Sequence, residues 1–206
     1  MKIVFFDYNT EKIDAYEKIF FTYKRLSGTP ELEFICCDVK ELFNTRPGIH
    51  MIVSPANSKG DMDGGIDEVY SKMFPRIEKA VKKRIKEATN GMSYLPIGSA
   101  ILLGMNNKSC PFLIIAPTMT HPQSLLGREG NIYWTMIGIL SLINNIQNNK
   151  LVIAIPCLGT GIGNLSGIES AELVKHAFED YYFGKVKHIK KIVKDSSTAF
   201  VLSKRK

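Results

Sequence analysis

The sequence lacks the features that mark several classes of protein. No apolar run approaches the roughly 18 residues that a membrane-spanning helix needs. The N-terminus has one Lys followed by acidic residues, where a signal peptide needs a longer apolar stretch and a cleavage site. The 9 Pro and 16 Gly form no low-complexity tract, which argues against a disordered or fibrous chain. These absences predict a globular, intracellular protein of the cytoplasm with no membrane partner.

Cysteine is scarce, and its spacing excludes two kinds of site. The chain has four cysteines, Cys36, Cys37, Cys110 and Cys157, and no C-x-x-C pair. This pattern argues against a disulfide framework and against a zinc site. We therefore expect reduced thiols and no bound metal.

The net charge of +7 is unevenly distributed along the chain. Residues 71–91 carry seven basic and two acidic side chains, and residues 184–206 carry eight and one. Apolar residues recur at helical spacing within Met73–Ala88, so its lysines predict the solvated face of a surface helix. The C-terminal basic segment either contacts a polyanion such as nucleic acid or keeps the protein soluble, and both interpretations stay open.

Strands and helices alternate along the chain. Strands are predicted at Lys2–Asp7, Leu32–Asp38, Met51–Ser54, Ile97–Leu103, Phe112–Ala116, Leu151–Pro156 and Ile189–Lys194, and helices from Asn9 or Thr10 to about Leu26, at Met73–Ala88, at 131–147 and at Glu169–Tyr182. Helix-length crossovers predict an α/β fold, a three-layer α/β/α sandwich with a central mixed, largely parallel sheet. Ligands of such sheets bind beyond the carboxyl ends of the strands.

A glycine-rich loop follows the predicted strand Met51–Ser54. Gly64 and Gly65 stand just before a helix, where a bare backbone and the helix N-terminus favour an anion. Asn57 supplies an amide that can hold a hydroxyl, and Asp67 falls in the first helical turn. The alternative is a plain glycine turn in which Asp67 only stabilises the helix dipole.

A second glycine-rich loop follows the strand Leu151–Pro156. Gly159, Thr160, Gly161 and Gly163 can form a nest of N–H donors for a diphosphate. The loop is neither a P-loop nor a complete dinucleotide fingerprint. It therefore indicates binding of a nucleotide diphosphate without metal-driven phosphoryl transfer.

Together with Asp38 at the end of an earlier strand, the two loops resemble the macro domain family, whose members bind ADP-ribose and in several branches hydrolyse it from proteins. The family's Asn-Ala-Ala-Asn motif and Gly-Gly-Val-Asp run are similar to Ser54–Asn57 and Gly64–Asp67. The family's phosphate loop is similar to Gly159–Gly163. The resemblance runs from about residue 36 to residue 182.

The finer sequence context resembles one part of that family. Met62–Asp67, Leu95–Ala100 and Ile115–Met119 look most like a microbial and phage-associated branch. The resemblance implies a single macro-like domain over residues 1–206. Residues 1–30 are then an added strand–helix unit on the sheet edge, without chemistry of its own, and residues 184–206 a basic C-terminal segment.

The resemblance also implies a role for each matching residue. Asp38 is expected to accept a hydrogen bond from the adenine amino group, although it can equally be a turn residue that ends a strand. Asn57 is expected to orient the distal ribose, and Asp67 to activate the water that attacks the anomeric carbon, without a metal or cofactor. The residues placed against the ligand are Asp38, Val39, Ala56, Asn57, Gly64, Gly65, Ile66, Gly159, Thr160, Gly161, Ile162 and Gly163.

The chain departs from the family pattern at three places. The first Asn of the family motif is Ser54, and an aromatic that packs on the distal ribose in many hydrolytic relatives is replaced by Gly163. The aromatic that stacks on adenine is not assigned, and the candidates are Tyr181, Tyr182 and Phe200. These departures bear on how tightly the ribose is held.

Two other catalytic patterns are incomplete. The segment Phe5–Thr10 resembles the start of a haloacid-dehalogenase-type phosphatase, with Asp7 as nucleophile, but the second acidic position is Asn9. His121 and Cys157 are the residue types of a nucleophilic pair. We interpret them as a loop imidazole and a buried thiol.

The sequence therefore favours an ADP-ribose-binding domain with mono-ADP-ribose hydrolysis as its activity. The first alternative is a non-catalytic module that recognises ADP-ribosylated proteins, ADP-ribosylated nucleic acid or free ADP-ribose. The second is a nucleic-acid or poly-ADP-ribose binder that uses the basic tail.

Overall fold

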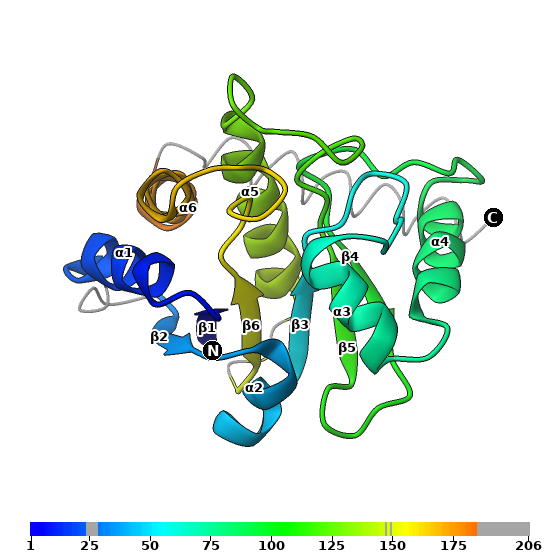
Figure 1. The fold of residues 1–206 in the computed structure, drawn as a ribbon, viewed down its shortest axis with the longest axis horizontal. Coiled ribbons are helices and arrows are strands. Elements are labelled where there is room, and N and C mark those ends of the chain that lie inside the picture. The colour runs from blue at the N-terminus through cyan, green and yellow to red at the C-terminus, as the bar shows by residue number, and fades with distance from the viewer. Residues whose placement is uncertain (24–28, 147, 149, 185–206) are drawn as a thin grey trace.

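One mixed sheet forms the centre of the structure, a computed structural model that describes residues 1–23, 29–146, 148 and 150–184. Within these residues the strand order is β2-β1-β6-β3-β5-β4 (Figure 1). The strands are β1 (Lys2–Asp7), β2 (Glu31–Cys36), β3 (Met51–Ser54), β4 (Ile101–Gly104), β5 (Phe112–Ile115) and β6 (Val152–Pro156). Neighbouring strands are parallel except β4 and β5, which are antiparallel.

Six helices cover the sheet in the described residues. They are α1 (Thr10–Phe20), α2 (Val39–Thr45), α3 (Gly65–Met73), α4 (Ile77–Ala88), α5 (Gly130–Asn145) and α6 (Gly167–Phe183). Buried side chains of α1, α5 and α6 form one apolar core with the sheet, and those of α2, α3 and α4 form a second. The predicted three-layer α/β/α sandwich with a mixed, largely parallel sheet is thereby confirmed.

Burial on both faces follows from the side-chain alternation of the strands. In β1, Phe5 faces the core with α1 and Phe6 faces the other core. In β6, Ile153 and Ile155 face the first core and Ala154 the second. Because helices cover both faces, these strands are continuous apolar runs.

The N-terminal unit is placed differently from the expectation. Strand β1 lies inside the sheet between β2 and β6, so its predicted position on the sheet edge is wrong. Residues Lys2–Asp7 pair with Glu31–Cys36 on one side, and Lys2–Phe6 pair with Val152–Pro156 on the other. The strand at this edge of the sheet is β2. As a result, the end of β1 opens onto the same rim of the sheet as the second glycine-rich loop.

The predicted basic helix Met73–Ala88 begins later than expected, and a separate helix precedes it. Helix α3 ends at Met73, and α4 begins at Ile77 after Arg76, which has a positive φ of 65°. Pro75 lies in the break, where a residue without an N–H group cannot continue a helical ladder. The predicted apolar stripe of α4 is confirmed at Ile77, Val81 and Ile85.

Smaller differences concern the ends of elements. Regular α1 ends at Phe20, short of the predicted end near Leu26, and β4 begins at Ile101 rather than Ile97. The predicted strand Ile189–Lys194 and the basic segment 185–206 lie outside the described residues. No helix in the described part of the chain is long and apolar enough to span a bilayer.

Candidate functional site

One cavity is lined by the end of β1, the segments after β2 and β3, and both glycine-rich loops. It measures about 370 Å³ and lies at the carboxyl ends of parallel strands, where ligands of open α/β sheets bind. The predicted residues that line it are Asp38, Val39, Asn57, Gly64, Gly65, Ile66, Asp67, Gly159, Thr160, Gly161, Ile162 and Gly163. Ala56 is the predicted residue that does not line it. Its side chain is buried, and its carbonyl accepts the Thr118 N–H at 3.3 Å.

The first loop ends in an uncapped helix N-terminus. Helix α3 starts at Gly65, whose φ of +59° suits glycine, and its N-cap Gly64 makes no side-chain cap hydrogen bond. Among the described residues, none accepts a hydrogen bond from the backbone N–H groups of Gly65, Ile66 and Asp67. These groups line a cavity wall and are the donors that helix N-termini offer to anions.

The second loop presents a further set of N–H groups. Gly159 has a φ of +72°, and the N–H groups of residues 159–163 find no acceptor within the described residues. The loop is held by other contacts, since the Thr160 hydroxyl donates to the Cys157 carbonyl at 3.0 Å. Ile162 extends toward Gly64 of the first loop, so the two loops close on one another across the cavity.

Asp67 is a buried carboxyl group on the cavity wall. Its exposed fraction is 7%. The Ser54 hydroxyl donates a hydrogen bond to Asp67 Oδ1, and the Tyr70 hydroxyl, one turn later, donates to the Val53 carbonyl at 3.1 Å and fixes α3 against β3. Burial raises the pKa of Asp67 to about 7, and the Ser54 hydrogen bond opposes that rise.

Asn57 organises the first loop. Its Oδ1 accepts the N–H groups of Lys59 at 3.0 Å and Asp61 at 3.3 Å, and its Nδ2 donates to the Asp61 carbonyl at 3.4 Å. The side chain is buried and still lines the cavity. Asn57 therefore shapes the loop whatever it does to a ligand.

Asp38 caps helix α2 and lines the cavity. Its Oδ1 accepts the Lys40 N–H at 2.8 Å, as an N-cap aspartate does. The other carboxylate oxygen has no partner among the described residues. Val39, the first residue of α2, is buried beside it.

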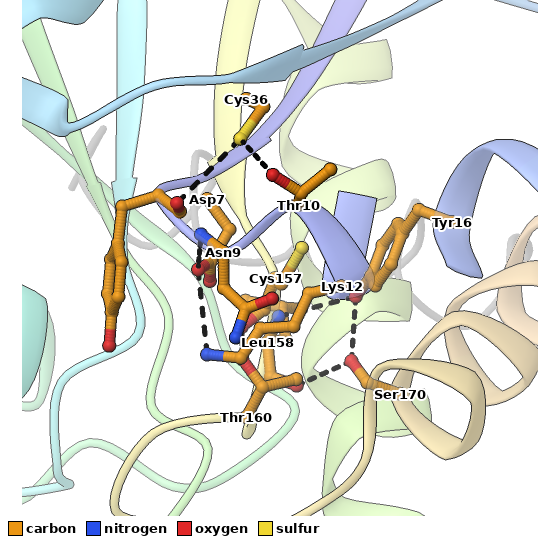
Figure 2. A network of polar contacts seen from close by, with 11 residues as sticks. Asp7, Asn9, Thr10, Lys12, Tyr16, Cys36, Cys157, Leu158, Thr160 and Ser170 are labelled. Atoms are coloured by element: carbon orange, nitrogen blue, oxygen red, sulfur yellow. Dashed lines mark hydrogen bonds and ion pairs between the residues drawn. The ribbon is translucent and has the colours of Figure 1, made fainter. Parts of the chain in front are cut away.

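Sequence analysis missed a group of residues from the N-terminal unit. Asp7, Tyr8 and Lys12 line the cavity, and Figure 2 shows Asp7 and Lys12 beside Cys157 and Thr160. Lys12 Nζ lies 3.5 Å from Asp7 Oδ1 and 5.4 Å from the centre of the Tyr8 ring. The available signal was the polar Asp7-Tyr8 pair directly after an apolar strand.

The predicted candidates for an adenine-stacking aromatic do not lie at the cavity. Tyr181 and Tyr182 pack in and beside the core of α5 and α6, and Phe200 lies outside the described residues. Two aromatic residues line the cavity in the described part of the chain: Phe6, which is buried, and Tyr8, which is 75% exposed. The β1–β2 register pairs Asp7 with Cys36, so Tyr8 comes just beyond the pair, near Asp38.

The remaining patterns show no catalytic arrangement. His121 Nδ1 lies 3.0 Å from the Thr120 hydroxyl, and His121 does not line the cavity. Burial raises the pKa of the Cys157 thiol well above its ordinary value, which opposes a nucleophilic thiolate. The backbone leaves no room for an aromatic side chain at position 163, because a Cβ on Gly163 would lie 2.4 Å from the Gly159 carbonyl oxygen.

Known proteins share this fold and part of this sequence. A curated relative, an uncharacterized protein of Aquifex aeolicus, is 30% identical over 115 residues, which are 56% of this chain and 64% of that protein. The chain thus spans just under two thirds of that relative.

Two solved structures are similar at lower identity, which shows the fold alone. The macrodomain of Mycobacterium tuberculosis DarG matches with a TM-score of 0.53 and 23% identity, over 66% of this chain and 86% of that one. A mutant Oceanobacillus iheyensis macrodomain with ADPR matches with a TM-score of 0.55 and 19% identity, over 77% and 89%. The family model named Macro domain matches residues 53–174, more than half of the chain. With both glycine-rich loops inside that match, the chain belongs to the macro domain family.

Proposed function

We propose that the cavity binds ADP-ribose and that the protein hydrolyses mono-ADP-ribose from modified macromolecules. One observation carries the binding proposal. Two loops, each with backbone N–H groups that have no acceptor in the described residues, close on the same cavity beside a buried carboxyl group. Such paired nests suit a diphosphate. Related Oceanobacillus iheyensis macrodomain structures contain ADP or ADPR, which supports the same ligand class here.

The adenine half of the ligand is assigned to the Asp38 end of the cavity. The second carboxylate oxygen of Asp38 accepts a hydrogen bond from the adenine amino group, and the exposed ring of Tyr8 stacks on the base. The diphosphate then lies between Gly64–Ile66 and Gly159–Gly163. In this order the distal ribose lies near Asn57 and Asp67, which both line the cavity.

Asp67 is the proposed general base. Water loses a proton to the Asp67 carboxylate, and its oxygen bonds to the anomeric carbon of the distal ribose. The bond from that carbon to the target breaks, and its electron pair leaves with the target group. Only the ionised form can accept the proton. Since the pKa of Asp67 is about 7, the rate is expected to rise with pH through about 7.

Ser54 lowers the pKa of this base. Its hydroxyl donates to Asp67 Oδ1 and favours the ionised form, so the serine that replaces the family's asparagine takes part in the site. In Ser54→Ala the rise of the rate should move to higher pH.

The alternative is a binding module that does not turn ADP-ribose over. The high pKa of Asp67 and the lack of space for an aromatic at Gly163 favour it specifically. Modified proteins or nucleic acids are the proposed partners in either case, and contact through the basic tail stays a prediction. The microbial and phage-associated branch, the division at residues 30 and 184, and the cytoplasmic location also remain proposals from the sequence.

A turnover assay tests the hydrolase. Release of ADP-ribose from a mono-ADP-ribosylated protein is measured for the wild type and Asp67→Asn, with ADP-ribose binding measured in parallel. Asp67→Asn should lower the rate by about 10²–10⁴-fold and change binding much less. Equal background release by both proteins, with binding intact, would replace the hydrolase by the binding module.

A further inference from the structure

Lys12 supplies the positive charge of the cavity wall. Among the described residues that line the cavity it alone is basic, whereas Asp7, Asp38, Asp61, Asp63 and Asp67 are acidic. A bound diphosphate adds full negative charges to a cavity whose wall is already acidic. Backbone N–H groups offer only partial charges, so a cation inside the cavity changes the balance of attraction and repulsion.

The ammonium group is held in place by the end of β1. Asp7 accepts the Asn9 N–H at 3.0 Å and lies 3.5 Å from Lys12 Nζ. The ammonium also lies over the Tyr8 ring, 5.4 Å from the ring centre. An ammonium has three donors, and Asp7 leaves donors for a ligand. Lys12 is therefore oriented before a ligand arrives, which lowers the entropy cost of binding.

The position of Lys12 in its helix is electrostatically unfavourable. It is the third residue of α1, in the first turn, where the helix dipole is positive and acidic residues are preferred. This lysine does not stabilise the helix electrostatically. A residue that breaks such a local rule is expected to have a role elsewhere, here in the contacts of its side chain.

The ammonium also lies beside the second glycine-rich loop. Figure 2 shows the Lys12 side chain running from α1 to Asp7, and both Lys12 and Thr160 line the cavity. The charge of Lys12 acts on Cys157, where it opposes the rise in the thiol pKa. The cation and the N–H groups of Gly159–Gly163 thus face one ligand volume.

We propose that Lys12 binds the ligand's phosphate directly and that the N-terminal strand–helix unit thereby completes the ADP-ribose site as its source of positive charge. This inference rests on the proposed function. It gives the N-terminal unit a chemical role and makes ligand charge a determinant of affinity.

Calorimetric titration with ADP-ribose tests this role at low and high NaCl concentration. The proteins are the wild type, Lys12→Met, Lys12→Arg and the matched control Lys18→Met, which removes the same charge from the exposed last turn of α1. Thermal unfolding verifies that each variant is folded. Lys12→Met should weaken binding by about tenfold to hundredfold at low salt, the range for a charge-assisted hydrogen bond. Its affinity should also depend less on salt.

Lys12→Arg should keep most of the affinity, and Lys18→Met should match the wild type. If Lys12→Met binds with wild-type affinity and salt dependence, Lys12 has no contact with phosphate and the inference is wrong, although the proposed function stands. An equal loss in Lys18→Met also contradicts a direct contact. If the wild type itself binds no ADP-ribose, the proposed function fails and the inference fails with it.

Discussion

The raised pKa of Asp67 makes the stability of the protein depend on pH. An unfolded aspartate loses its proton near pH 3.8, whereas burial holds the proton on native Asp67 up to a pH of about 7. Between these values the native state binds more protons than the unfolded state. The contribution of Asp67 to stability is therefore complete below pH 3.8 and is lost as the pH rises to about 7.

Asp67→Asn removes this pH dependence and keeps an oxygen for the Ser54 hydroxyl. Relative to the wild type, the variant should gain about 2–4 kcal/mol of unfolding free energy between pH 4 and pH 8, since each pKa unit corresponds to about 1.4 kcal/mol. Urea unfolding at several pH values measures the difference. A difference that stays constant with pH contradicts the raised pKa.

We propose two separable tasks for Asp38. One carboxylate oxygen caps α2, and the residue also lines the cavity, where we expect it to bind adenine. Asp38→Ser keeps a capping oxygen and should weaken ADP-ribose binding by about 1–3 kcal/mol with little change in stability. Asp38→Ala should lose the same affinity and also about 1 kcal/mol of stability. Calorimetry and urea unfolding separate the two effects, and unchanged affinity in both variants places the adenine elsewhere.

At the scale of elements, the second loop depends on close backbone packing. A side chain at Gly163 meets the Gly159 carbonyl oxygen at 2.4 Å and Leu125 at 2.9 Å, whereas a Cβ at Gly161 meets nothing within 4 Å. Gly163→Phe should therefore destabilise the protein by about 1–3 kcal/mol or more and abolish ADP-ribose binding, because the loop must move.

Gly161→Ala is the matched control, with a stability change within about 0.5 kcal/mol. Thermal unfolding and calorimetry of the two variants measure both effects. Faster hydrolysis in Gly163→Phe would mean that the loop accepts an aromatic there, against the packing described above.

The elements also show which parts of the site could be read from the sequence. Both glycine-rich loops follow apolar strands, so local pattern was sufficient to place Gly64 and Gly159 at the same rim of a parallel sheet. The break before α4 had a local signal in Pro75. The position of β1 had none, because pairing with β6 joins residues about 150 positions apart and local pattern does not encode it.

At the scale of the whole molecule, that long-range pairing decides the chemistry of the cavity. Because β1 lies between β2 and β6, residues 6–8 and Lys12 reach a site whose other lining residues follow residue 36. The packing of Gly167 against Lys12 on the α1 side further ties α6 to the N-terminal unit. Four residues of the N-terminal unit are thus part of the cavity wall, which the sequence pattern alone did not predict.

The central claim is that this cavity binds ADP-ribose in the native state. Its most direct measurement is the unfolding free energy in urea with and without ADP-ribose, with AMP and NAD as comparison ligands. At 100 times the dissociation constant, ADP-ribose should add about 2.7 kcal/mol, because it binds the folded state alone. AMP and NAD should add less at equal concentration, since ADP-ribose fills both loops and the distal end of the cavity. No stabilisation at millimolar ADP-ribose would contradict the account.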